Sequence, residues 1–128
     1  MRPDYIVMTN NPKTIKRWPD AAEAVQGGVA QVFEAVRDRI HLGHKLLTHP
    51  LAGSVKPNES PFRSVIITRR ADTSVDFDSL RLIEAAISTL VKLGPGRRGQ
   101  MPESVRCDYQ LIDAELMNNA IESLQRQH

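Results

Sequence analysis

The amino-acid sequence predicts an α/β protein, with a small sheet of four to five strands covered by about three helices in a Rossmann-like layered architecture. Two short runs of apolar and β-branched residues, at 4–9 and 63–68, are typical of buried strands. Two longer segments, beginning near Gly28 and Asp76, repeat apolar residues at helical spacing. Because strand and helix patterns alternate along the chain, a sheet packed against helices is expected.

The first strand is expected at residues 4–9, where an apolar run leads into the turn residues Asn10, Asn11 and Pro12. The segment 18–26 is ambiguous, since its proline and aspartate could start a helical turn, but a short strand at 22–25 is favoured. The helix that begins near Gly28 should end at Gly43, because glycine readily adopts the left-handed conformation that follows many helices.

A short strand at 45–48 should lead into a long loop stiffened by prolines, and a further strand is expected at 63–68. Asp76 is a suitable N-cap for the second helix, which should stop before Gly94.

The C-terminal part of the chain is expected to form a strand followed by a helix. Apolar and polar residues alternate over 105–111, which predicts a half-buried strand near the edge of the sheet. Asp113 is then expected to cap a last helix whose apolar residues continue to Leu124.

Length and composition limit the class of protein. The 128 residues suit a single α/β domain spanning 1–128. Seventeen basic and fifteen acidic residues leave a net charge of +2, too little to predict nucleic-acid binding. The one cysteine, Cys107, rules out an intramolecular disulfide and favours a reducing compartment. Apolar runs are too short for a signal peptide or a membrane span, so a cytoplasmic protein without membrane contact is expected.

Polar side chains gather where the predicted strands end. The stretch 41–61 holds three histidines among prolines, hydroxyl groups and a lysine. If residues 45–48 run parallel to the first strand and beside it, His49 emerges at the same sheet edge as Asn10. Backbone amides at such an edge favour anions, and histidine can move a proton near neutral pH. The predicted binding residues for a small carboxylate or phosphate are Thr9, Asn10, Asn11, His44, His49, Ser54, Lys56 and Asn58.

Other interpretations of these residues stay open. The prolines and asparagines could simply build turns while the histidines cap helix ends. No metal site is predicted, because the H-x2-H-x4-H spacing of His41, His44 and His49 matches no standard zinc arrangement. No cofactor is expected, since neither of the common glycine-rich nucleotide motifs is present. Cys107 is best interpreted as an inert thiol in a strand.

Three stretches of the sequence resemble the GrdX family. They are T-N-N-P at 9–12, the long segment at 36–65 that includes H-L-G-H-K-L-L-T-H-P-L-A-G-S-V-K-P-N-E-S-P, and D-Y-Q-L-I-D at 108–113. The resemblance implies a small cytoplasmic protein encoded alongside the selenium-dependent glycine, sarcosine or betaine reductases of amino-acid-fermenting anaerobes. It implies no reaction, so no catalytic residue carries over.

Three functions follow as hypotheses. The first is an accessory or regulatory protein of the glycine/betaine/sarcosine reductase system that binds a small anionic metabolite at the strand-end loops. The second is a small enzyme that uses His49 as acid or base on an acyl-phosphate or amino-acid derivative, with Lys56 stabilising charge. The third is a partner-docking protein without a small ligand, whose loop contacts reductase components. An exposed edge strand also favours a homodimer.

Overall fold

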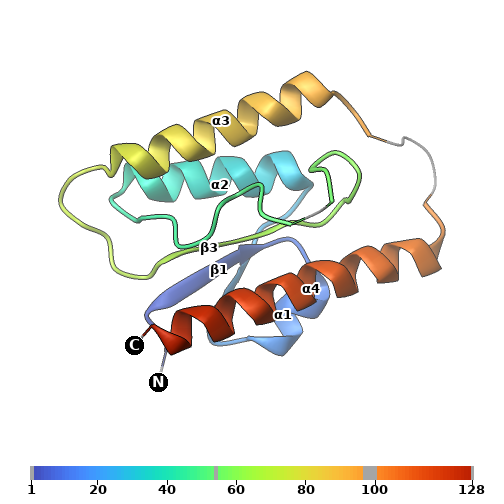
Figure 1. Ribbon diagram of the computed structural model, residues 1–128, viewed down its shortest axis with the longest axis horizontal. Helices are drawn as coiled ribbons and strands as arrows, with labels where there is room; N and C mark the ends of the chain where they lie inside the picture. The colour runs from blue at the N-terminus through green and yellow to red at the C-terminus, as the bar shows by residue number, and fades with distance from the viewer. Residues whose placement is uncertain (1, 54, 97–100, 128) are drawn as a thin grey trace.

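The computed structural model describes residues 2–53, 55–96 and 101–127. Strands and helices alternate in the first half of the chain, and helices dominate the second half (Figure 1). In chain order the elements are β1 (Tyr5–Thr9), α1 (Pro12–Arg17), β2 (Ala22–Ala24), α2 (Val29–His41), β3 (Ser64–Thr68), α3 (Phe77–Leu93) and α4 (Glu103–Arg126).

The sheet is mixed, with the strand order β2-β1-β3. β2 runs parallel to β1, whereas β3 runs antiparallel to it in a register that pairs Thr9 with Ser64. Residues 45–48 lie along the outer edge of β3 but form only one isolated bridge, from Leu46 to Ile67. The α/β class is therefore confirmed, while the described residues form three strands and four helices rather than four to five strands and about three helices.

The Rossmann-like architecture is not supported. A doubly wound fold needs a mostly parallel sheet, in which each crossover helix returns the chain to the same direction. Here the chain between β2 and β3 passes through α2 and the long loop and then enters β3 in the opposite direction.

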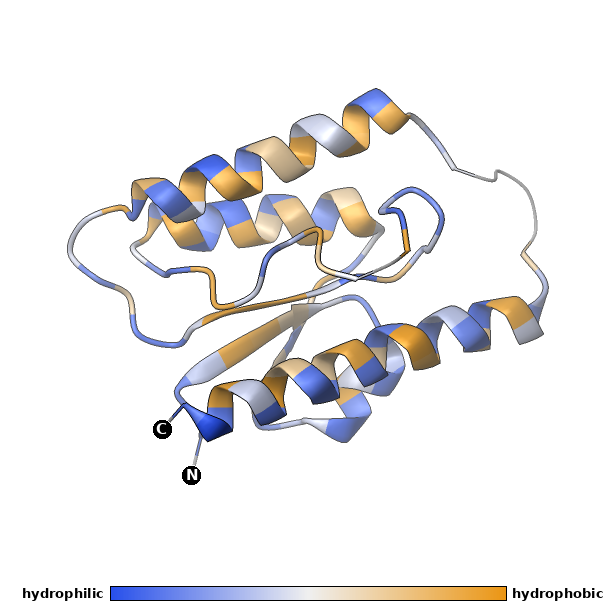
Figure 2. Cartoon of the chain, viewed as in Figure 1, coloured by the Kyte–Doolittle hydropathy of each residue, from blue (hydrophilic) through white to orange (hydrophobic). Residues whose placement is uncertain are grey.

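Helices cover both faces of the sheet (Figure 1). Alternate strand residues point to opposite faces, so Met8 and Ile67 pack with α2 and α3, and Val7 and Ile66 pack with α4. Phe33 of α2 is completely buried in the first cluster. Apolar and polar residues alternate around the helices (Figure 2), and the buried apolar residues of α2, α3 and α4 pack against the sheet.

The predicted strand at 105–111 is wrong, because these residues are the first part of α4. That part carries partly exposed apolar side chains, with 37% of Val105 and 53% of Leu111 accessible, so no core packing imposes a helical period on it. Further along, Ala114, Met117 and Ile121 do follow helical spacing and are buried. Asp113 is consequently a mid-helix residue and not an N-cap.

Other helix boundaries follow from local chemistry. Asp76 caps α3 as predicted, with its carboxylate accepting from Ser79 N. Gly43 follows the end of α2 with φ +110°, the conformation expected of it. The short helix α1 was not predicted, although Asn11 caps it by accepting from Lys13 N.

No helix in the described part of the chain is both long and apolar enough to cross a membrane.

Candidate functional site

A buried carboxylate joins the two halves of the chain. Asp113 of α4 is only 6% exposed, and its Oδ2 accepts three side-chain hydrogen bonds. The donors are Ser64 Oγ at 2.6 Å, Asn11 Nδ2 at 2.9 Å and Thr14 Oγ1 at 3.4 Å. Because the donors come from β3, the β1–α1 turn and α1, this one acceptor links α4 to three other parts of the fold.

Thr9 extends this cluster to the end of β1. Its hydroxyl lies 2.7 Å from Ser64 Oγ and also accepts from Asn11 N. Since Ser64 gives its proton to Asp113, Thr9 is the donor in the first of these bonds. Asn11 in turn donates to the Gln110 carbonyl of α4. The polar groups of Thr9 and Asn11 are thus satisfied within the protein.

Asn10 connects the same turn to the loop that precedes β3. Its Nδ2 donates to Gly27 O at 3.0 Å and to Pro61 O at 2.8 Å, and its Oδ1 accepts from Arg63 N at 2.9 Å. The side chain therefore fixes the backbone of Arg63 at the start of β3.

Arg63 is the least usual residue of this region, because it carries a charge and is only 5% exposed. Its Nη1 and Nη2 donate to Ala52 O and Val55 O at 3.1 and 3.2 Å, which ties the long loop to β3. Nε is buried without a hydrogen-bond partner among the described residues. Burial lowers the pKa of the guanidinium, and the nearby charge of Asp113 acts in the opposite direction.

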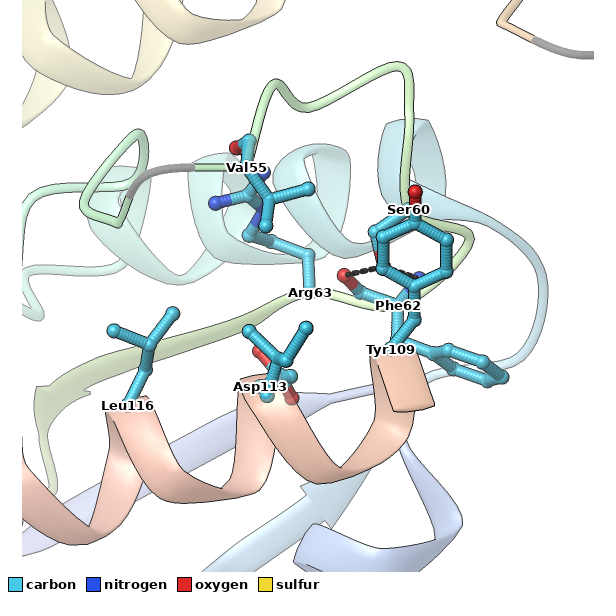
Figure 3. Close-up of a pocket in the computed structure, with 8 residues that line it drawn as sticks. Val55, Ser60, Phe62, Arg63, Tyr109, Asp113 and Leu116 are labelled. Atoms are coloured by element: carbon cyan, nitrogen blue, oxygen red, sulfur yellow. Dashed lines mark hydrogen bonds between the residues drawn. The ribbon is translucent and has the colours of Figure 1, made fainter. Parts of the chain in front are cut away.

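A small pocket lies between the long loop and α4, beside both charged groups (Figure 3). Its volume is about 10 Å³, room for about one water molecule. Apolar side chains form most of the wall, and Ile112 at its edge is 42% exposed. The lining residues are Val55, Ser60, Phe62, Arg63, Tyr109, Ile112, Asp113 and Leu116.

The structure brings together some of the residues predicted to bind an anion. Thr9 and Asn11 belong to the cluster around Asp113, and Asn10 between them bonds the backbone of Arg63. His44 lies at the other end of β3, where its Nδ1 is 2.7 Å from Thr68 O. His49 is exposed, and its Nδ1 accepts from Leu51 N.

The remaining predicted residues lie on the long loop. Lys56 is exposed, and Asn58 is partly buried, with its Nδ2 3.5 Å from both Leu93 O and Gly94 O. The amide oxygen of Asn58 is buried and unpaired among the described residues. Ser54 lies outside the described residues. In the ranges that the structure describes, no group of three His, Cys, Asp or Glu side chains is placed to hold a metal ion.

The sequence interpretation missed Arg63, Ser64 and Asp113. Arg63 precedes a run of apolar residues and was treated as the polar start of a strand. The helical spacing of Asp113, Met117 and Ile121 contained a usable signal, because it places an acid on the buried side of α4. A charged residue on an apolar face is expected to have specific partners.

The fold and the site define a small α/β protein with a mixed sheet, a buried polar junction and a narrow pocket beside a buried arginine. The family model described as "GrdX-like protein" matches residues 6–122. The chain belongs to the GrdX-like family, which confirms the resemblance carried by its motifs. Comparison with curated proteins gave no match, and comparison with solved structures gave none either.

Proposed function

We propose that this protein is an accessory or regulatory protein of the glycine/betaine/sarcosine reductase system, and that it binds a small anionic metabolite. The observation that carries the ligand part of the proposal is the unpaired Nε–H of Arg63 beside the pocket. The reductase setting comes from what the family resemblance implies.

An unpaired buried donor on a cation is costly, because the group has lost its water without gaining another acceptor. The other two nitrogens of Arg63 are engaged by backbone carbonyls, so the guanidinium is held in a fixed orientation. An anion that enters the pocket would meet a preorganised donor in a region of low dielectric, where a charge-assisted hydrogen bond is strong.

This proposal moves the binding site away from the side chains first expected to form it. The side chains of Thr9 and Asn11 are already hydrogen-bonded, to Ser64, to Asp113 and to the first turn of α1. Asn10 does not line the pocket, and its proposed role is to position the backbone of Arg63. His49 is not among the lining residues, so we assign it no acid–base role in this pocket.

The test is to close the mouth of the pocket without disturbing its interior. Ile112→Trp adds bulk at a lining residue that is 42% exposed, and Leu111→Trp makes the same change at a residue that is 53% exposed and does not line the pocket. Acetate and inorganic phosphate are the probes, each compared with chloride at equal ionic strength. Binding is measured by titration calorimetry and by the midpoint of thermal unfolding.

An anion present at ten times its Kd should stabilise the wild-type protein by about 1.4 kcal/mol. That corresponds to a rise in midpoint of about 5 °C for a chain of this size. Ile112→Trp should abolish the rise, whereas Leu111→Trp should retain it. If neither anion stabilises the wild-type protein more than chloride does, or if both variants respond alike, the pocket is not the binding site.

A further inference from the structure

Two opposite charges border the same pocket without neutralising each other directly. Arg63 lies on the loop side and Asp113 on the α4 side (Figure 3). The ion pairs within 4.0 Å among the described residues do not include this pair. The space between Arg63 and Asp113 therefore has a positive side and a negative side.

Each of these groups has one polar atom that the protein leaves without a partner in the described residues. Asp113 Oδ2 accepts the hydrogen bonds from Ser64, Asn11 and Thr14, whereas Oδ1 accepts no hydrogen bond from the described residues. On Arg63, Nη1 and Nη2 are engaged and Nε is not. A ligand that carries an acceptor and a donor at once would satisfy both groups.

We propose that the ligand is a small zwitterion, a free α-amino acid, whose carboxylate accepts from Arg63 Nε and whose ammonium group donates to Asp113 Oδ1. This inference rests on the proposed function, since it uses the same pocket and the same arginine. The carboxylate and ammonium groups of an amino acid are joined through one carbon, so one compact molecule can meet both charges.

The walls limit the size of such a ligand. With room for about one water, the pocket takes a larger occupant only when lining side chains such as Ile112 move outward. Rotamer changes are fast for an exposed side chain, and Ile112 is exposed. The apolar groups of Val55, Ile112 and Leu116 would face the carbon atoms of the ligand, which favours an amino acid with no side chain or a short apolar one.

The experiment compares three probes by titration calorimetry on the wild-type protein: glycine, acetate and methylammonium. Acetate has the carboxylate and lacks the ammonium group. Methylammonium has the ammonium group and lacks the carboxylate. Glycine is expected to bind at least tenfold more tightly than either. Equal affinity for glycine and acetate would overturn the zwitterion and leave the anion site standing, whereas no binding of any probe would overturn both.

Asp113→Asn then tests the negative side of the pocket. The amide oxygen can take the place of Oδ2 and keep the bonds from Ser64 and Asn11, and the amide NH₂ takes the place of Oδ1. Glycine affinity should fall at least tenfold, while acetate affinity should stay within about twofold. The matched control is Asp108→Asn, which removes a charge from an exposed site on the same helix that does not line the pocket.

The same variant can also disprove the role of Asp113. If glycine binds Asp113→Asn as tightly as it binds the wild-type protein, Asp113 does not hold the ammonium group. If the variant fails to fold, the comparison of the three probes on the wild-type protein decides the question alone.

Discussion

Replacing Asp113 with alanine removes the one acceptor shared by Ser64, Asn11 and Thr14. The three donors do not lose equally strong hydrogen bonds. Asn11 Nδ2 keeps its bond to Gln110 O, and the bond from Thr14 is already long at 3.4 Å. Ser64 loses its shortest bond, 2.6 Å to a carboxylate. Leaving buried donors unpaired costs about 1–3 kcal/mol for each, more when the lost acceptor is charged.

We therefore expect Asp113→Ala to cost about 2–4 kcal/mol, because buried donors lose a charged acceptor that they share. A loss of that size should lower the midpoint of thermal unfolding by roughly 10 °C. Urea denaturation followed by circular dichroism measures the free energy of unfolding, with Asp113→Asn as the control that retains an acceptor. A loss below about 1 kcal/mol for Asp113→Ala would refute the view that this carboxylate fastens α4.

Three further outcomes are expected. Gly43→Ala should destabilise the protein by more than about 2 kcal/mol, because φ is +110° and the new Cβ would lie 2.0 Å from Asp72 O. Urea denaturation measures this loss, and a change under about 0.5 kcal/mol would contradict the geometry. Hydrogen bonds from Ser79 lower the pKa of Asp76, so its stabilising effect is present above the unfolded pKa and disappears as the pH falls through the folded value. Asp76→Asn should flatten the stability profile in that acidic range, and an unchanged slope would count against the cap. Affinity-tagged protein should retain reductase components from an extract of the source cells, and retention that survives mutation of Lys56 to glutamate would show that the long loop is not the contact.

Patterns that depend on neighbouring residues were predicted well. The helical period of α2 and the cap of α3 at Asp76 are set by side chains a few residues apart, and both are present in the structure. β1 and β3 were also predicted, because a short run of apolar β-branched residues favours a strand over other secondary structures. α1 was missed since Asn11 and Pro12 are as common in turns as at helix starts.

Features that depend on distant contacts were not predictable in the same way. The alternation at 105–111 is compatible with a strand, and the buried residues Met117 and Ile121 that reveal the helical period of α4 lie beyond it. The predicted site required the strand at 45–48 to lie beside β1 and parallel to it, but β3 occupies that place and residues 45–48 lie at the sheet edge. Sequence cannot show which strand takes which position.

The candidate site illustrates the same limit. The turn of Thr9, Asn10 and Asn11 was chosen for its polar groups, which the fold uses internally. Arg63 and Asp113 are fifty residues apart in sequence, and nothing local indicates that they border one pocket.

The attachment of α4 also has a consequence during synthesis of the chain. Asn11 and Thr14 reach Asp113 across more than 95 residues, so the ribosome releases β1, β2 and β3 before their partner on α4 exists. Until then the sheet face of Val7 and Ile66 lacks Met117 and Ile121, and a nascent chain paused at that stage presents part of this apolar surface to chaperones or to other nascent chains. Completion of α4 converts that vulnerable intermediate into the closed protein.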